Sequence, residues 1–314
     1  MTAGGSRRTA GRQGPAAPRR RSGRSEGGAA APLAGWYAER GRHDLPWRAS
    51  RDRWAVLVSE VMLQQTQAGR VAAVWPGFMA RFPTPEAMAA VPAGDVIAAW
   101  GTLGYPRRAR RLWEAAGRIA AGGWPHDLAD LPGVGRYTAD AVAAQADGHD
   151  TAAIETNIRR VVERHAGRRL TPAEAAAASR AAGRPLTGRD RLLALMDVGA
   201  VLCRPAAPRC PDCPLEPGCA TAASIATGEA GPAPSPSPGG PVRGPGPAAA
   251  VPWRELGRPA RQPAYEGSFR QRRGRVLAEL RAGPRPSAAL DAAALASLVE
   301  DGLAALDGPL ARLP

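Results

Sequence analysis

Four cysteines that lie close together constrain most strongly what this chain can fold into. Cys203, Cys210, Cys213 and Cys219 are its only cysteines, and they follow the spacing C-x6-C-x2-C-x5-C. A structural zinc site usually has two close pairs of ligands, each on its own turn, whereas here one close pair is flanked by two single thiols. The spacing therefore predicts a [4Fe-4S] cluster held by four thiolates, with zinc as the alternative.

The charge of the chain indicates a polyanionic partner. Its formal net charge is +14 over 314 residues, and all 42 basic residues are arginine because the sequence contains no lysine. The planar guanidinium group donates paired hydrogen bonds that suit phosphates and guanine edges. We therefore expect electrostatic binding to nucleic acid.

No segment predicts export or a membrane span. No apolar stretch follows the arginines near the amino terminus, as a signal peptide requires, and none approaches the roughly 18–20 apolar residues of a spanning helix. We expect a cytoplasmic, nucleoid-associated monomer with no membrane partner. Cysteines in that compartment favour a metal or a cluster over disulfides.

Two low-complexity segments flank a block of helical periodicity. Residues 1–32 contain seven arginines, one glutamate and few large apolar side chains, which predicts a disordered basic tail. Residues 225–252 are rich in Gly, Pro and Ala and predict a linker. The block at 33–224 has few strand signals and predicts an all-α domain that carries the cysteine loop at 203–219.

A smaller module is expected at 253–314. Helical patterns cover 270–281 and 290–303, and a short hairpin is expected around Asp307-Gly308. This order predicts a small helical or winged-helix-like module. Its first helix carries arginines that either contact phosphate or form a solvated face: Arg270, Arg272, Arg273 and Arg275.

An acid lies beside an apolar stripe in the segment WAVLVSEVM, residues 54–62. Glu60 is flanked by apolar positions that recur with helical spacing. Burial against such a face raises the pKa of a carboxyl group, a condition that suits a general acid. The alternative is an acid at the edge of the stripe that turns toward water.

The segment LPGVGRYTADAV, residues 131–142, combines a tight turn with the start of a helix. Gly133 and Gly135 leave the backbone N–H groups accessible, so that they can bind a phosphate oxygen at the positive end of the helix. The alternative is a helix–helix turn without a ligand.

A second acid, Glu155, precedes a helix in AAIETNIRR, residues 152–160. One interpretation makes it part of a reaction centre. The other makes it an ordinary acid near the positive end of a helix dipole, with Thr156 or Asn157 as the N-cap.

Taken together, these motifs resemble the helix–hairpin–helix superfamily of base-excision DNA glycosylases, and within it the adenine DNA glycosylase (MutY) branch. The resemblance runs collinearly over about 36–221. It implies a six-helix barrel beside an iron–sulfur cluster domain, with double-stranded DNA across the cleft. The segments that carry it are LPWR (45–48), SEVMLQQTQ (59–67), GTLGYPRRARRL (101–112), LPGVGRYTA (131–139), TNIRRV (156–161) and MDVGAVLC (196–203).

The resemblance implies a role for each matching residue. Glu60 would protonate the leaving adenine, and Glu155 would face an oxocarbenium-like sugar from the position of the family's aspartate. Tyr137 and Asn157 would support that carboxylate. The implied DNA-contacting residues are Trp47, Arg48 and Leu63 in the adenine pocket, with Gln65 and Tyr105 as wedges where the bases part.

Tyr137 distinguishes this chain from the neighbouring endonuclease III branch. That branch places a lysine there as an imine-forming nucleophile, whereas this sequence has tyrosine and no lysine at all. Asn157 also replaces the histidine usual in that branch. The missing lysine predicts a monofunctional hydrolase, and the resemblance implies that it removes adenine opposite 8-oxoguanine or guanine.

Two departures from the family pattern leave other functions open. Glu155 is one methylene longer than the family's aspartate, which moves the carboxylate by about 1.5 Å. The family's Nudix-like C-terminal domain, which reads 8-oxoguanine, is not recognisable at 253–314. The alternatives are a related mismatch glycosylase for thymine or uracil, and a DNA-binding homologue weakened in catalysis by Glu155.

Overall fold

The computed structural model describes Met1 and residues 32–228, 253, 255–256 and 264–314. The predicted basic tail at 1–32 and most of the predicted linker at 225–252 lie outside these residues. The chain divides into two compact units, Met1–Ala30 and Ala31–Pro314. The description that follows concerns the second unit.

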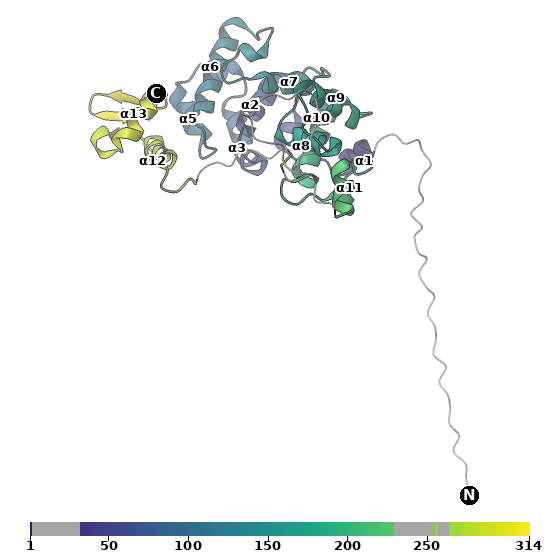
Figure 1. The fold of residues 1–314 in the computed structure, drawn as a ribbon. Coiled ribbons are helices and arrows are strands. Elements are labelled where there is room, and N and C mark those ends of the chain that lie inside the picture. The colour runs from purple at the N-terminus through teal and green to yellow at the C-terminus, as the bar shows by residue number, and fades with distance from the viewer. Residues whose placement is uncertain (2–31, 229–252, 254, 257–263) are drawn as a thin grey trace, which may run out of the picture. The chain divides into compact units, whose positions relative to one another are not determined.

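Helices make up most of the described backbone in this unit and strands very little of it, which confirms the all-α expectation (Figure 1). Aspartate, threonine or serine side chains cap several of them; Asp52, for example, accepts a hydrogen bond of 2.8 Å from the Ala55 N–H. The helices before the C-terminal module are α1 (Pro32–Arg40), α2 (Arg53–Leu63), α3 (Ala68–Arg81), α4 (Pro85–Ala89), α5 (Ala93–Trp100), α6 (Arg107–Gly122), α7 (Arg136–Gln145), α8 (Thr156–Ala166), α9 (Pro172–Ala182), α10 (Gly188–Asp197) and α11 (Ala220–Ala226).

Short helical turns connect these helices near the functional segments. Three are 3-10 turns and one, η3, is a π-helical turn that continues α10 toward the cysteine loop. They are η1 (Pro46–Ala49), η2 (Leu128–Asp130), η3 (Val198–Leu202) and η4 (Cys210–Asp212).

The C-terminal module has the predicted order of two helices and a hairpin. Its helices are α12 (Phe269–Arg281) and α13 (Ala292–Glu300), with the 3-10 turn η5 (Ser287–Ala289) between them. Three short strands pair antiparallel in the order β1-β3-β2. The strands are β1 (Arg285–Pro286), β2 (Ala305–Asp307) and β3 (Leu310–Arg312).

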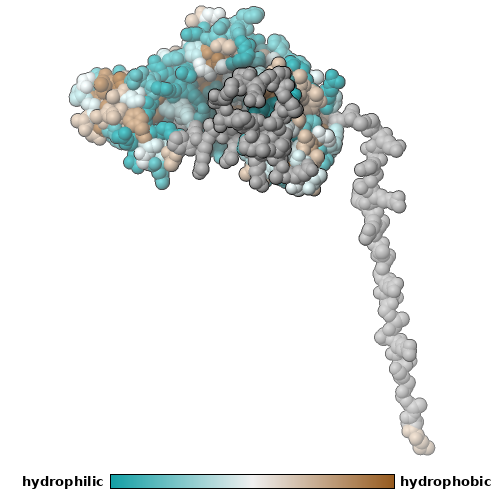
Figure 2. Space-filling view, viewed as in Figure 1, coloured by the Kyte–Doolittle hydropathy of each residue, from teal (hydrophilic) through white to brown (hydrophobic). Residues whose placement is uncertain are grey.

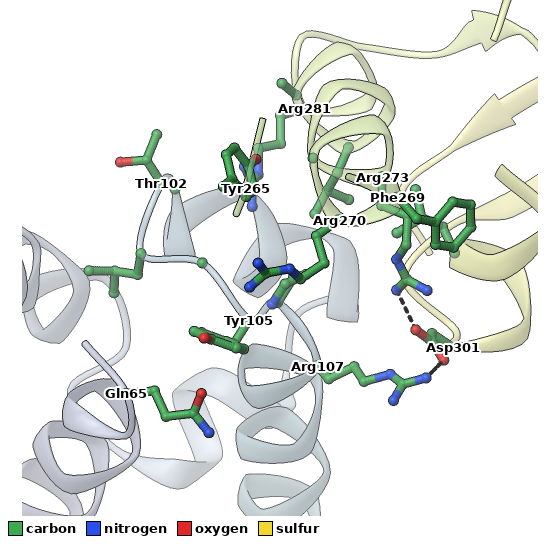
Figure 3. Close-up of a pocket in the computed structure, with 18 of the residues that line it drawn as sticks. Gln65, Thr102, Tyr105, Arg107, Tyr265, Phe269, Arg270, Arg273, Arg281 and Asp301 are labelled. Carbon is green, nitrogen blue, oxygen red and sulfur yellow. Dashed lines mark hydrogen bonds and ion pairs between the residues drawn. The ribbon is translucent and has the colours of Figure 1, made fainter. Parts of the chain in front are cut away.

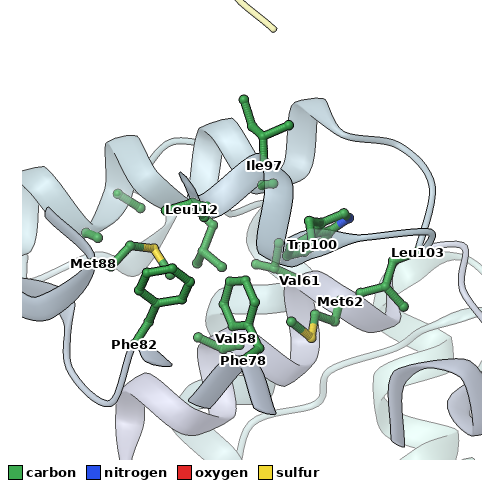
Figure 4. Close-up of a cluster of buried hydrophobic side chains, with 14 of the residues drawn as sticks. Val58, Val61, Met62, Phe78, Phe82, Met88, Ile97, Trp100, Leu103 and Leu112 are labelled. Atoms are coloured by element: carbon green, nitrogen blue, oxygen red, sulfur yellow. The ribbon is translucent and has the colours of Figure 1, made fainter. Parts of the chain in front are cut away.

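Two apolar cores support the helices, and α7 packs into both. Ala139 and Val142 on α7 belong to a core built around α2, α3, α5 and α6. Ala141 and Ala144, on another face of the same helix, belong to a core shared with α1, α8, α9 and α10. Figure 4 shows the centre of the first core, where the rings of Phe78 and Phe82 lie among side chains from α2, α5 and α6. Helix α7 thus joins the two cores, and it packs against α2 in the first of them.

The surface is mainly polar on the face shown in Figure 2. Apolar side chains gather at the end of that face formed by the C-terminal module, where Leu306 and Leu310 of the hairpin are exposed. Among the described helices, none combines the length and apolar character that crossing a membrane requires.

Candidate active site and cysteine loop

Glu60 is a buried acid on α2. Its residue is only 4% exposed, because the helix is covered on all sides along this stretch. Burial raises the pKa of the carboxyl group, and the negative charge of Glu155 raises it further. The alternative in which Glu60 turns toward water does not hold in this structure.

The neighbours of Glu60 come from α7. Gln145 donates a hydrogen bond from Nε2 to Glu60 Oε1 at 2.7 Å. Tyr137 also hydrogen-bonds to the Glu60 carboxylate, and both bonds lower the pKa that burial has raised. Burial beside Glu60 and Glu155 in turn holds the pKa of the Tyr137 phenol well above its ordinary value. Tyr137 is therefore a neutral hydroxyl that hydrogen-bonds to Glu60 and is affected by the charge of Glu155.

Glu155 is itself the N-cap of α8, in place of the Thr156 or Asn157 expected as the cap. Its Oε1 accepts a hydrogen bond of 2.8 Å from the Ile158 N–H, and its Oε2 accepts one of 2.7 Å from the Asn157 N–H. Burial raises the pKa of Glu155 overall, and these backbone bonds and the charge of Arg160 only reduce the rise. The carboxylate therefore caps the helix, and its charge also acts on Tyr137.

Asn157 connects Glu155 to the cysteine loop through Arg160. Asn157 Nδ2 donates to Glu155 Oε2 at 3.0 Å, while its Oδ1 accepts from Arg160 Nη2 at 2.6 Å. Arg160 also donates to the carbonyl oxygens of Gly199 and Cys203, both at 2.7 Å. Gly199 is required at this crossing, because a Cβ there would lie 2.6 Å from Asn157 Cβ. The predicted supporting residue is thus fixed from two sides.

Arg48 is held by a buried carboxylate that sequence analysis did not single out. Arg48 donates from Nη1 and Nη2 to the two oxygens of Asp197 at 2.6 and 2.8 Å. Arg42 donates to the same carboxylate at 2.7 Å. Burial raises the pKa of Asp197, but the two arginines outweigh burial and the pKa lies below its ordinary value. The Arg48 charge also lowers the pKa of Glu60, so this ion pair lies near the acid.

The two apolar residues of the predicted adenine pocket differ in burial. Trp47, on η1, is 4% exposed and packs within the first core. Leu63, the last residue of α2, is half-buried and packs against that core. The structure thus places Leu63, rather than Trp47, at the edge of the packed interior.

Gln65 and Tyr105 share an uncommon backbone conformation. Among the described residues, they are the only non-glycine residues with positive φ, at 55° and 49°. Arg108 lies between their loops and donates from Nη1 to the carbonyl oxygens of Val61, Met62 and Gln64 at 2.5–2.9 Å.

Arg108 reaches the second loop as well. Its Nη2 donates to Thr66 Oγ1 at 2.9 Å and to the Gly104 carbonyl at 3.0 Å. Its guanidinium carbon lies 5.3 Å from the Trp100 ring and 5.2 Å from the Tyr105 ring. Arg108 therefore holds together the two loops that carry the predicted wedge residues.

The predicted phosphate-binding turn opens α7. Gly135 is exposed and is the N-cap of the helix, and a Cβ added there would meet no atom within 4 Å. Gly133 has a φ of +78°, and a Cβ there would lie 2.9 Å from Arg111 Cβ. Glycine at 133 is therefore needed for the turn, whereas Gly135 leaves its side of the backbone open.

The four cysteines line one small cavity between α8, η3, η4 and α11. All are half-buried and unbonded to one another. Burial raises the pKa of Cys213 to about 12. Burial also raises the pKa of Cys210 and Cys219, and the neighbouring sulfurs add to the shift. Thiols in such a site become thiolates only with a compensating cation, so the donor set fits a metal centre.

Buried Arg164 fixes the loop around this cavity. It donates to the carbonyl oxygens of Arg204 and Pro205, both at 2.8 Å, and lies 3.6 Å from Cys203 Sγ. In the described part of the chain, no three Cys, His, Asp or Glu side chains form a preformed site for a single metal ion. A cubane does not require that arrangement, because each thiolate binds a different iron.

Several structurally important residues gave no local signal in the sequence. Gln145 and Asp197 contact site residues 85 and 149 positions away. Arg108 and Arg164 stand in arginine-rich segments in which nothing marks them out from their neighbours. One weak signal existed: Gln145 continues the apolar stripe of Val142, and a polar side chain buried in such a stripe needs a hydrogen-bond partner.

Comparisons with known proteins agree with this geometry. The family model described as the HhH-GPD superfamily base excision DNA repair protein matches residues 58–183. An adenine DNA glycosylase of Mycobacterium tuberculosis is 40% identical over 296 residues, which cover 86% of this chain and 88% of that protein. The human adenine DNA glycosylase is 36% identical over 208 residues, covering 60% of this chain and 38% of that protein.

A solved structure of a thermostable thymine-DNA glycosylase is similar in fold. It superposes with a TM-score of 0.54 and 28% sequence identity, covering 62% of this chain and 94% of that chain. The family model and the mycobacterial relative agree on the family. The chain therefore belongs to the helix–hairpin–helix base excision DNA repair proteins and, within them, to the adenine DNA glycosylases, which are hydrolases of N-glycosyl bonds.

Proposed function

We propose that this glycosylase removes adenine paired with 8-oxoguanine or guanine, by hydrolysis and without a lyase step. The observation that carries the proposal is the pair of acids Glu60 and Glu155, which act on each other electrostatically and both raise the pKa of the Tyr137 phenol. Glycoside hydrolysis needs one protonated acid and one ionised carboxylate. The two groups have surroundings that suit these different tasks.

Glu60 is the proton donor. Purine loss requires protonation of the leaving base, and a carboxyl group can supply that proton near neutral pH only if its pKa is raised. Burial of Glu60 provides the rise, and only Gln145, Tyr137 and the charge of Arg48 oppose it. We therefore assign the proton that reaches adenine to Glu60.

We assign the ionised carboxylate that stabilises the sugar cation to Glu155, although burial raises its pKa overall. It accepts hydrogen bonds from two backbone N–H groups and from Asn157 Nδ2, with Arg160 nearby. Each of these partners favours the charged form. The cap bonds at the start of α8 hold the carboxylate in place, and we propose that the same carboxylate also acts in catalysis. The longer side chain of Glu155 folds back to make these bonds.

A lysine-based lyase step has no nucleophile in this chain. An imine with the sugar aldehyde needs an uncharged amine, usually that of lysine, and the sequence contains no lysine. At the position in question Tyr137 is a protonated phenol beside two acids. We propose that water completes the reaction and that the product is an intact abasic strand.

We propose that Cys203, Cys210, Cys213 and Cys219 hold a [4Fe-4S] cluster. The support is the shared cavity, the need for a compensating cation, and the Arg164 contacts that fix the loop. When bound, the cluster would supply four iron–thiolate bonds that cross-link the loop between η3 and α11. Arg160 would link the cluster loop to Asn157, because it donates hydrogen bonds to both Cys203 and Asn157.

The test is single-turnover base release from duplexes that contain A:8-oxoG, A:G, T:G or U:G. We expect release from the two adenine duplexes, and strand breakage only after alkali or heat. Borohydride should trap little covalent adduct. Release from T:G or U:G alone would favour the function of the similar thymine-DNA glycosylase. Tight binding without release from any duplex would indicate a homologue weakened at Glu155.

A further inference from the structure

A tryptophan from the C-terminal part of the chain lies against the cysteine loop. Trp253 is half-buried and contacts Arg164 of α8, which is 89 positions earlier in the sequence. The Trp253 carbonyl oxygen accepts a hydrogen bond of 3.2 Å from Arg164 Nε, and the Arg164 guanidinium carbon lies 5.1 Å from the Trp253 ring. Trp253 thus contacts Arg164 through both its backbone and its ring.

Two near neighbours of Trp253 are also held in place. The Glu255 carbonyl oxygen accepts a hydrogen bond of 3.4 Å from Arg169 Nη2, just beyond the end of α8. Leu256 is 1% exposed, and its N–H donates to the Trp253 carbonyl oxygen at 3.3 Å. Hydrogen bonds, a ring contact and apolar burial therefore all fix the position of Trp253.

Arg164 contacts the cysteines on its other side. It is 1% exposed, its Nη1 lies 3.6 Å from Cys203 Sγ, and its carbonyl oxygen lies 3.7 Å from Cys219 Sγ. Arg164 also lines the cavity that the four cysteines share, whereas Trp253 does not. Arg164 thus stands between Trp253 and the first and last cysteines of the set.

The positive charge of Arg164 is buried without a carboxylate partner in the described part of the chain. Glu163, the only acid within α8, pairs with Arg159 instead. A buried guanidinium group then depends on carbonyl oxygens, a ring face and sulfur for its stabilisation, and a cation–ring contact is strongest when the cation is desolvated. Without the Trp253 ring, we expect the Arg164 side chain to turn toward water.

We propose that Trp253 is a positioning residue of the metal site, which holds the Arg164 guanidinium group against Cys203 Sγ. A charged donor beside a ligand sulfur stabilises the thiolate and therefore the bond from sulfur to metal. Trp253 thus slows the loss of the metal by keeping Arg164 in place and water away from Cys203. This inference rests on the proposed metal site, and it does not depend on which base the enzyme removes.

The C-terminal module has a second attachment that does not involve Trp253. Helix α12 and residues 101–107 line a pocket of about 930 Å³ (Figure 3). Beside this pocket, Asp301 pairs with both Arg107 of α6 and Arg273 of α12. Replacement of Asp301 therefore loosens the module without touching the cysteine cavity.

The experiment measures the rate of metal loss from the folded, full-length protein. Iron release under ferricyanide is followed with bathophenanthroline, and zinc release, if the purified protein holds zinc, with 4-(2-pyridylazo)resorcinol. Trp253→Ala should lose the metal about tenfold faster, the lower end of the range for residues that support a metal ligand. Trp253→Phe should restore the wild-type rate because a ring still faces the cation, whereas Trp253→Leu, which is apolar but has no ring, should not.

Three further variants separate this role from general packing. Trp124→Ala removes another half-buried ring, 5.7 Å from the Arg53 guanidinium carbon and outside the cysteine cavity. This variant and Asp301→Asn should leave the rate of metal loss unchanged. In an Arg164→Lys background, Trp253→Ala should have no further effect, because the tryptophan acts through the arginine.

Three results would overturn the proposal. They are an equal acceleration by Trp124→Ala or Asp301→Asn, a full rescue by Trp253→Leu, and additive effects of Trp253→Ala and Arg164→Lys. A purified protein without any bound metal would overturn this inference together with the proposed metal site. A protein that holds zinc, or that releases no adenine, would overturn part of the proposed function only, and the same comparison of metal loss would still decide the role of Trp253.

Discussion

Gln145 on α7 donates a hydrogen bond of 2.7 Å to the carboxylate of Glu60 on α2, and both residues are buried. The bond favours the ionised form of Glu60 and lowers a pKa that burial raises. Gln145 therefore limits how far the pKa of the proposed acid rises. It also fixes the orientation of the Glu60 carboxyl group, because the bond joins α7 to α2.

Removing this donor should change the pH dependence of base release. Base release requires protonated Glu60, so its rate falls as pH rises through the Glu60 pKa. Gln145→Met removes a bond that lowers this pKa, and we expect the alkaline limb of the single-turnover profile to move to higher pH. Gln64→Met, whose amide bonds to Gly133 and Thr138 instead, should leave the limb in place. A shift toward lower pH would contradict the role given to Gln145.

Asp197 should contribute strongly to stability. Replacement by Asn leaves Arg48 and Arg42 without their carboxylate in a buried site, and breaking such a pair costs about 3–5 kcal/mol. Urea unfolding of Asp197→Asn measures this loss. Asp95→Asn breaks an exposed pair with Arg81 and should cost less than about 1 kcal/mol. An equal loss of unfolding free energy in the two variants would contradict the larger contribution expected of the buried pair.

Arg108 should control the geometry of the wedge loops. Arg108→Lys keeps the charge but cannot reach the carbonyl oxygens of both loops at once. We expect base release to slow by about 100-fold, the scale of a small misplacement of positioning groups. Arg118→Lys, on the exposed side of α6, is the matched control. An unchanged rate for Arg108→Lys would remove Arg108 from the positioning of Gln65 and Tyr105.

The cysteine loop should depend on its metal. Cys213→Ser removes one of four proposed ligands, and we expect loss of iron and of the visible absorbance of the cluster. The melting temperature should fall together with DNA affinity, because Arg160 connects this loop to Asn157. Iron analysis after anaerobic purification is the measurement. Stoichiometric zinc without iron in the wild-type protein would replace the cluster with a zinc site.

Local patterns in the sequence predicted elements but not distant partners. The apolar spacing around Glu60 predicted a helix, and the turn at Asp307-Gly308 predicted a hairpin, because both depend on neighbours within a few residues. The pair of Arg48 and Asp197 spans 149 positions, so only the packing of α10 against η1 could reveal it. For the same reason, the sequence did not predict that α12 and residues 101–107 line one pocket.

Glu155 shows a different limit of sequence analysis. The sequence offered two interpretations, a helix-terminal acid or a catalytic one, and the structure combines features of both. Its carboxylate bonds to the backbone of α8 and also raises the pKa of Tyr137. No pattern in IETN could show that the longer side chain folds back onto its own helix. The two roles therefore have to be separated by measurement.

Glu155→Asp should keep or increase the activity. Aspartate caps helices well, retains the charge that faces the sugar, and has the length that the family pattern carries at this position. We expect a single-turnover rate at or above that of the wild type and a similar melting temperature. A rate about 100-fold lower would mean that the site has adapted to the longer acid.

The measurement that tests the central claim most directly is the single-turnover rate of Glu155→Gln on an A:8-oxoG duplex, taken beside its melting temperature. Glutamine keeps the shape and one acceptor oxygen, so it can accept from the Ile158 N–H or the Asn157 N–H but not from both as the two carboxylate oxygens do. Loss of the charge should slow release by about 10²–10⁴-fold, while stability falls by at most about 0.5–2 kcal/mol, the range for a cap. A Glu155→Gln protein that releases adenine as fast as the wild type would contradict the account and leave Glu155 as a helix cap only.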